Sequence, residues 1–283
     1  MQTISGVTSW LFPLAAVLVA ALSMPRVVQA SGDFYLLYRH WQPYDWPEYV
    51  PSASEVSRSQ RGLGWSRHGA MGAIGADYDY QPLRIRTGEP AHNGHLHRLV
   101  FTGHWQHRLY RLETRAGVAG TSNMFKHQTF HSDVVNGRVA MFRALGEGSP
   151  LSLGVGGDHR FGSFQWLPRA RWEHAHESGR WLIDLPIMLW WQSYAGRWEL
   201  LLKRTGDRWA TLDQDQEVEG ALYLREWRAE LTYRIRSAEE QSPEMVVGLG
   251  ASVDTRVRYR DLEAGTVDRR LGDALLGTIR LNW

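Results

Sequence analysis

The sequence is dominated by long stretches in which apolar residues occupy every second position. In the longest, residues 245–259, odd positions carry Met, Val, Leu, Ala, Val, Thr, Val and Tyr, and even positions become charged toward one end. Alternation with a period of two indicates a β-strand, because successive side chains point to opposite faces. A strand of a soluble protein usually has about five or six residues. We therefore expect an all-β chain whose strands are long enough to cross a membrane, which takes roughly 9–11 residues.

Aromatic residues recur at the ends of these stretches. Trp181 and Trp191 lie ten residues apart on one face, and Tyr223 and Tyr233 repeat that interval. At ~3.3 Å per residue and ~40° of tilt, ten residues span roughly 25 Å, the height of the apolar band of an outer-membrane barrel. The predicted aromatic girdle consists of Trp105, Trp181, Trp191, Tyr223, Tyr233, Tyr259 and Trp283.

The first thirty residues have the features of an export signal. An apolar run extends from Trp10 to Met24, and Val28-Gln29-Ala30 then fits a signal-peptidase site. We expect residues 1–30 to be a cleaved signal peptide; the alternative is a membrane anchor, although the run is short for a spanning helix of ~20 residues.

The C-terminal strand resembles the terminal strand of bacterial outer-membrane barrels, which ends in Phe or Trp. Leu275, Gly277, Ile279, Leu281 and Trp283 alternate with other residues, and the sequence ends at the aromatic residue. This resemblance implies the outer membrane of a Gram-negative bacterium as location. It also implies outer-membrane lipid and the barrel-assembly machinery, contacted through the strand ending at Trp283, as partners.

Residues 66–283 also resemble an uncharacterised family of outer-membrane barrels, a domain of unknown function. The residues that carry this likeness are the stretch from Pro168 to Pro186 with Trp181 inside it, Trp198, and the strand 248–258. The likeness implies fold and location, and it implies no activity.

The predicted fold is a transmembrane antiparallel up-and-down β-barrel of about twelve strands, with ten or eight as alternatives. Residues 66–283 form the barrel, and residues 31–65, rich in Pro and Ser, form an irregular segment that can include the first strand. The predicted strands are 33–42, 66–80, 95–105, 108–120, 136–145, 150–160, 163–175, 181–193, 197–212, 219–237, 243–260 and 273–283.

This topology leaves one conflict. The long stretches 81–94 and 121–135 should be extracellular, yet counting strands back from Trp283 places them in the periplasm. Pro168 and Pro186 fall inside predicted strands, and they indicate bulges because a closed barrel has no edge strand.

Charged residues alternate with the apolar ones, and in a membrane barrel they would face the lumen. The lumen-lining candidates are Arg111, Glu113, Arg115, Arg169, Arg171, Glu173, Asp254, Arg256 and Arg258. Either these charges pair and fill the lumen, giving a structural outer-membrane component, or they line a passive pore for small polar solutes. Their mixed signs predict weak ion selectivity.

Catalytic and metal-binding signals are weak, so whether the chain is an enzyme stays open, with a non-enzyme favoured. Cysteine is absent, which excludes thiol chemistry, disulfides and cysteine metal sites. His92, His95 and His97 are weak metal-site candidates, and histidines scattered over a polar loop and strand end are the favoured explanation. No metal or other cofactor is predicted.

Two alternative functions remain. His131 and Ser132, followed by Asn136-Gly137-Arg138, faintly resemble the outer-membrane phospholipase, which keeps a lipid-modifying hydrolase open; adjacent strand residues, however, face opposite sides. The other alternative is a secreted soluble β-protein. A net charge of +2 without a basic run gives no reason to expect nucleic acid. The barrel is expected to be monomeric or weakly oligomeric.

Overall fold

A computed structural model describes residues 32–45, 55–85, 94–127, 132–159, 164–213, 218–236, 242–261 and 265–283. The expected signal peptide, residues 1–30, lies outside this part of the chain. Among the described residues, no helix has the length and apolar character needed to cross a membrane. The elements are β1 (Asp33–Trp41), β2 (Tyr44–Asp45), β3 (Glu55–Gly69), β4 (Gly72–Ile85), β5 (Gly94–His107), β6 (Tyr110–Thr121), α2 (Ser122–His127), η2 (Ser132–Val134), β7 (Val135–Ala144), β8 (Leu151–Asp158), β9 (Gln165–His176), β10 (Gly179–Leu185), β11 (Met188–Ser193), β12 (Trp198–Asp213), β13 (Val218–Ile235), β14 (Glu244–Asp261), β15 (Gly265–Arg270) and β16 (Ala274–Asn282).

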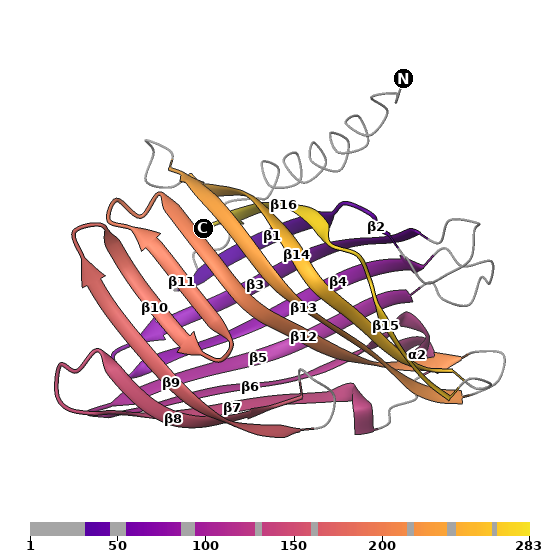
Figure 1. Ribbon diagram of the computed structural model, residues 1–283, viewed down its shortest axis with the longest axis horizontal. Helices are drawn as coiled ribbons and strands as arrows, with labels where there is room; N and C mark the ends of the chain where they lie inside the picture. Colours follow the sequence, from indigo (N-terminus) through magenta and orange to yellow (C-terminus); the bar gives the residue numbers. More distant parts are fainter. Residues whose placement is uncertain are drawn as a thin grey trace. The chain divides into compact units, whose positions relative to one another are not determined.

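The strands form one antiparallel sheet that closes into a ring (Figure 1). β1 pairs with β16 on one side and with β3 on the other, so the sheet returns to its beginning. β1 and β2 both pair with β3, and β15 and β16 both pair with β14, so each of these two pairs acts as one interrupted strand. The sixteen strand segments therefore make a ring of fourteen strands, an even number as in single-chain bacterial barrels.

The ring corrects the predicted count of twelve at two places. Residues 55–65, expected to be irregular, form most of β3, which lies between β1 and β4. Its alternation was hidden because polar or small residues occur on both faces, such as Arg58 and Gln60 on one and Ser57 and Ser59 on the other. Residues 181–193, expected to be one strand, form the hairpin β10–β11.

This hairpin also corrects the use of Trp181 and Trp191 as a height marker. The two residues are direct cross-strand partners, with ring centroids 6.0 Å apart, so they lie at the same height. Ile183 pairs with Leu189 in the same way, so odd-numbered residues of both strands share one face. The alternation therefore continues through the turn and does not reveal it.

The additional reversal resolves the conflict over loop placement. The backbones of Phe34 and Trp283 hydrogen-bond to each other, so both ends of the ring-forming chain meet at one end of the ring, here the terminal end. β4 and β6 both run away from this end and finish at the opposite, far end. The long segments that follow Ile85 and Thr121 therefore begin on the side opposite Trp283.

The two faces of the ring differ in chemistry. Large apolar side chains are exposed on the outer face, among them Ile74 and Phe101, each 59% exposed, and Leu249, 76% exposed. Arginine and acidic residues occupy the alternate, inner positions and are buried, as for Arg39, Arg228 and Glu230. A soluble protein would place these classes the other way round.

The wall of the ring is uneven. The hairpin β10–β11 is short and turns at Pro186–Ile187, beside the much longer β12 (Figure 1). Beyond it, β12 reaches β6 and forms a parallel bridge between Ala210 and Gly120. Pro186 thus lies in a turn. Pro168 lies on the part of β9 that extends beyond its pairing with β10, where this side of β9 is a free strand edge. Neither proline therefore marks a bulge of the kind predicted from the sequence.

A core cluster of buried apolar side chains fills the far half of the ring. All of its members are at most 8% exposed, and β7 to β11 supply none of them. β12 therefore separates a filled, narrow part of the ring from a second lobe bounded by β7 to β11. The cluster consists of Trp41, Tyr44, Val56, Leu83, Leu96, Ala119, Trp209, Leu222, Leu224, Val257, Leu271, Ala274 and Leu276.

The predicted aromatic girdle is concentrated at the terminal end. Trp105, Trp181, Trp191, Tyr233 and Trp283 all lie there, near the strand ends that adjoin terminal-side turns. Trp198 joins them and packs against Tyr233 with ring centroids 4.7 Å apart. Tyr223 lies toward the far end, as does the backbone of Tyr259 in β14, whose side chain is outside the described part.

Candidate functional site: a charged chamber inside the ring

A cavity of about 380 Å³, here the chamber, is lined by inner faces of β1, β3 to β7, β12 to β14 and β16. It extends to the terminal end, where Arg280 and Asn282 of β16 contribute. Cations outnumber anions along its wall. The inward basic residues are Arg39, Arg58, Arg98, Arg115, Arg138, Lys203, Arg228, Arg234 and Arg280, and the acidic ones are Asp77, Asp79, Glu199, Asp207 and Glu230.

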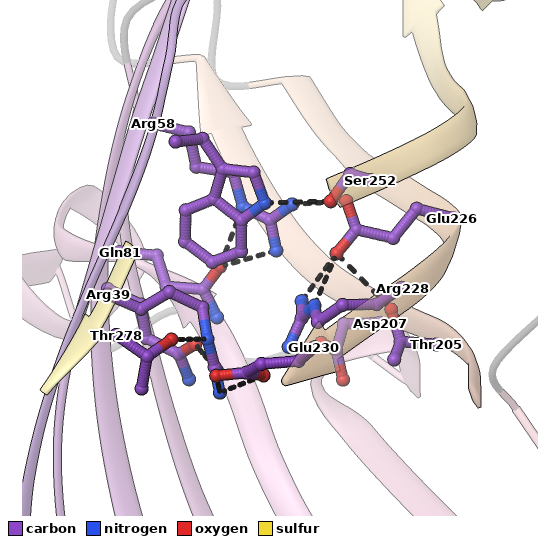
Figure 2. Close-up of polar contacts among 12 residues, drawn as sticks. Arg39, Arg58, Gln81, Thr205, Asp207, Glu226, Arg228, Glu230, Ser252 and Thr278 are labelled. Atoms are coloured by element: carbon purple, nitrogen blue, oxygen red, sulfur yellow. Dashed lines mark hydrogen bonds and ion pairs between the residues drawn. The ribbon is translucent and has the colours of Figure 1, made fainter. Parts of the chain in front are cut away.

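Arg39 connects opposite sides of the chamber (Figure 2). From β1 it donates to both carboxylate oxygens of Glu230 on β13, at 3.0 and 3.3 Å. It also donates to Thr278 Oγ1 at 3.0 Å and to Gln60 Oε1 at 2.9 Å. β16 and β14 separate β1 from β13 in the ring, so this contact crosses the lumen.

A second crossing joins β3 to β13 through Glu226, which is 1% exposed (Figure 2). Arg58 donates to Glu226 Oε2 at 2.9 Å, and Arg228 donates to Oε1 of the same carboxylate. Both guanidinium groups also lie over the indole ring of Trp41, at 4.0 and 5.1 Å from its centroid. Trp41 donates its indole N–H to Ser252 Oγ at 2.8 Å, which fixes the ring in place.

A third crossing joins β5 to β12. Arg98 forms ion pairs with Asp79 of the neighbouring strand and with Asp207 of β12. Asp79 also accepts from Gln60 Nε2 at 2.7 Å, which links this crossing to Arg39. The first and third crossings therefore form one hydrogen-bonded network.

Two cations on the chamber wall form no direct ion pair. Within the described part of the chain, no ion pair or hydrogen bond joins Arg115 of β6 or Lys203 of β12 to a carboxylate, although Asp77, Asp79 and Asp207 act electrostatically on Arg115, and Glu230 on Lys203. Both side chains are half-buried, and a partly desolvated cation without a directly paired anion is costly unless water or a solute anion neutralises it. These two side chains are therefore the best placed to attract an anion.

The second lobe carries its own ion-pair cluster. Asp184, fully buried, accepts from Arg169 at 2.9 and 2.5 Å and from Arg171 at 2.8 Å. Arg171 also pairs with Glu113, and Arg111 pairs with Glu173. The lobe includes a cavity of about 420 Å³ bordered by Arg111, Glu113, Arg171, Glu173 and Trp190.

The core cluster closes the axis of the ring at the far end. A much smaller second cavity, here the side cavity, has a volume of about 40 Å³ and shares Arg98, Arg115, Arg138 and Asp207 with the chamber wall. It extends to Asp158 and His159, where β8 ends at the far end.

Six of the nine lumen-lining candidates occupy inner positions: Arg111, Glu113, Arg115, Arg169, Arg171 and Glu173. Asp254, Arg256 and Arg258 do not fit the expectation. The register of β13 and β14 shifts between Arg225 and Trp227, and Asp254 has a φ of 50°. After this bulge, Thr255 and Val257 are buried inside, so Arg256 and Arg258 lie on the outer face.

The sequence prediction missed the residues that cross the chamber. Arg58 lies in the segment expected to be irregular. Glu226, Arg228 and Glu230 lie in the predicted strand 219–237, but they are absent from the predicted lumen-lining set. Three acidic or basic residues at every second position of 226–230 were an available signal, the same one that identified 111–115.

The weak metal-site and hydrolase candidates do not come together in the described structure. His92 and His131 lie outside the described residues, and so does the side chain of Ser132, whose backbone is in η2. His95 and His97 lie on the outer face, and each has its Nδ1 hydrogen-bonded to a tyrosine hydroxyl. No cluster of three metal-ligating side chains occurs in the described segments.

No protein-family model and no curated protein matches the sequence. The structure resembles an outer membrane channel from Pseudomonas putida F1, with a TM-score of 0.40 and 12% identity over 92% of this chain and 99% of that one. It also resembles the Pseudomonas putida toluene transporter TodX, with a TM-score of 0.35 and 9% identity over 93% of each chain. A TodX mutant described as a monoaromatic hydrocarbon channel gives 0.35 and 11%, also over 93% of each chain. All three are described as channels or transporters.

Proposed function

We propose that this protein is an outer-membrane β-barrel pore of a Gram-negative bacterium and that its lumen admits small anionic solutes. The excess of cations on the chamber wall carries the proposal, above all Arg115 and Lys203, which form no direct ion pair in the described structure. A narrow path lined mainly by one sign of charge concentrates ions of the other sign. Anion preference thus replaces the weak selectivity expected from the sequence.

The outer face supports a membrane location. Exposed apolar residues such as Ile74, Phe101 and Leu249 suit hydrocarbon, and the aromatic residues at the terminal end suit an interface. In this proposal residues 1–30 are removed on export, the assembly machinery reads the strand ending at Trp283, and the terminal end faces the periplasm.

The two cavities indicate the route that we propose for the solute. An anion enters the chamber at the terminal end and meets Lys203 and Arg115, and the side cavity, with a volume of about 40 Å³, must widen to pass it toward Asp158. The axial route is filled by the core cluster. Arg98 and Asp207 line both cavities, so their ion pair narrows the path.

Reversal potentials in planar bilayers under a KCl gradient test the proposal. The wild-type protein should prefer Cl⁻. The double variant Lys203→Glu and Arg115→Glu should lower the ratio of Cl⁻ to K⁺ permeability several-fold, because two charges on the chamber wall change sign. Arg143→Gln is the matched control, since Arg143 is an outward-facing arginine whose guanidinium lies 5.9 Å from the ring centroid of Tyr110. A wild-type protein that prefers K⁺, or a control variant that changes the permeability ratio as much as the double variant does, would contradict anion selection. A bilayer that shows no conductance would contradict the pore and leave a structural role for the protein.

A further inference from the structure

A separate polar cluster lies on the outer face of the ring near its far end. Ser122 begins α2, directly after β6, and its Oγ lies 2.7 Å from Nε2 of His97 on β5. Nδ1 of the same imidazole lies 2.7 Å from the hydroxyl oxygen of Tyr78 on β4. The three side chains thus form a chain of hydrogen bonds, hydroxyl to imidazole to phenol, built from three elements.

The alternation along β5 places this cluster outside the lumen. His97 shares its face with Leu99 and Phe101, which are 39% and 59% exposed, whereas Leu96 and Val100 are buried inside. Tyr78 is the direct cross-strand partner of Leu99, so it lies on the same outer face. The ion pairs of the chamber are on the opposite side of the sheet.

The imidazole of His97 is held on two further sides. Phe125 of α2 meets it edge-on, with ring centroids 5.9 Å apart, and Tyr80 packs against it at 5.1 Å. Tyr80 is itself stacked on His95 and hydrogen-bonded to it at 2.6 Å. Packing of α2 fixes Ser122, because Met124 is fully buried against Val134 and Ala210. The geometry is therefore imposed by the fold rather than by the three residues alone.

We propose that Ser122, His97 and Tyr78 form a hydrolytic site for carboxylic esters of membrane lipids. When His97 carries its proton on Nδ1, it donates to the hydroxyl oxygen of Tyr78, and Nε2 is free to accept the proton of Ser122 Oγ. A hydroxyl becomes nucleophilic when a base within hydrogen-bond reach removes its proton. Ser122 is the nucleophile, His97 the general base, and Tyr78 the positioning residue that selects this tautomer.

The reaction balances with water as the only co-reactant. Ser122 Oγ forms a bond to the ester carbonyl carbon while His97 takes its proton, and the ester C–O bond breaks as His97 protonates the leaving alcohol. Water then attacks the acyl-serine, giving its proton to His97, and the fatty acid leaves as the proton returns to Ser122. No electron transfer is involved.

The location selects the substrate class. In the proposed membrane orientation, Leu99 and Phe101 meet hydrocarbon, and the cluster lies toward the strand ends of the outer leaflet. The ester linkages of a lipid lie between its acyl chains and its headgroup. A soluble ester lacking acyl chains has no apolar surface to place against these residues.

Active-site labelling and lipid turnover test the proposal on the full-length protein in detergent micelles. A fluorophosphonate probe should label the wild type at Ser122, and mixed micelles of phosphatidylcholine should release fatty acid. Ser122→Ala should abolish labelling, and Ser122→Ala or His97→Asn should lower release by about 10²-fold or more. Ser178→Ala is the matched control, because Ser178 lies near His176 in a terminal-side turn and should change neither readout.

Tyr78→Phe separates catalysis from a purely structural contact. Loss of the phenol oxygen removes the acceptor for the Nδ1–H of His97. The value of kcat should therefore fall about tenfold, and the acidic limb of the pH–rate profile should shift. KM, and the mobility of the unboiled protein on a gel, should stay unchanged. Folded protein that neither takes up the probe nor releases fatty acid would overturn the proposal, as would full turnover by Ser122→Ala. Lys203→Glu should leave hydrolysis unchanged, so failure of this site and failure of the pore are distinguishable.

Discussion

At the scale of single residues, Glu226 is the point on which the buried network depends. It accepts from Arg58 and Arg228, and both cations also lie over Trp41. A buried ion pair contributes modestly to stability, but removing one partner leaves an uncompensated buried charge. Here one carboxylate forms ion pairs with two guanidinium groups.

We expect Glu226→Ala to reduce the free energy of unfolding by about 3–5 kcal/mol, because it leaves two buried cations without their anion. Glu173→Ala is the control: its carboxylate is 44% exposed, so loss of its pair with Arg111 should cost no more than about 1 kcal/mol. Denaturant unfolding in micelles, followed by tryptophan fluorescence, measures both. Equal losses for the two variants would show that the Glu226 network does not stabilise the ring.

At the scale of elements, the hairpin β10–β11 determines the number of strands. It also determines at which end of the ring the long segments after Ile85 and Thr121 begin. It is testable because the chain has no native cysteine. Trp181→Cys combined with Trp191→Cys should form a disulfide, since direct cross-strand partners have Cα atoms about 4.5–5.5 Å apart. In a single continuous strand these residues would be roughly 33 Å apart.

Mass spectrometry under non-reducing conditions reports the bridge. Trp181→Cys with Tyr233→Cys is the control, because these residues are not cross-strand partners and should remain reduced. A bridge in the control alone, or in neither variant, would argue against the hairpin.

The strands differ in how far the sequence predicts them. Regular alternation located β5, β6, β12, β13 and β14 well, since apolar residues recur at every second position along the outer face of each. It missed β3, where both faces carry polar residues, and the turn at Pro186, across which the alternation continues. It also misplaced Arg256 and Arg258, because a one-residue bulge at Asp254 exchanges inner and outer faces without interrupting the pattern.

At the scale of the whole ring, fourteen strands would enclose an open lumen, yet the interior is partly filled. The reason is β12, which reaches β6 and confines the core cluster to a narrower set of strands. Side chains fill the interior of small barrels, whereas larger barrels leave a channel. No periodicity signals such a contact between strands far apart in sequence. The chamber could therefore be predicted only as a set of inward charges.

The central claim is that neighbouring residues of one strand face lipid and a polar lumen in turn. Single cysteines at Leu231, 46% exposed on the outer face, and Thr232, on the chamber wall, test it in β13 of the protein in liposomes. Thr232→Cys should react with a water-soluble maleimide, and Leu231→Cys should react only with a lipid-soluble one. Equal reaction of both with the water-soluble reagent, or the reverse order, would contradict the account.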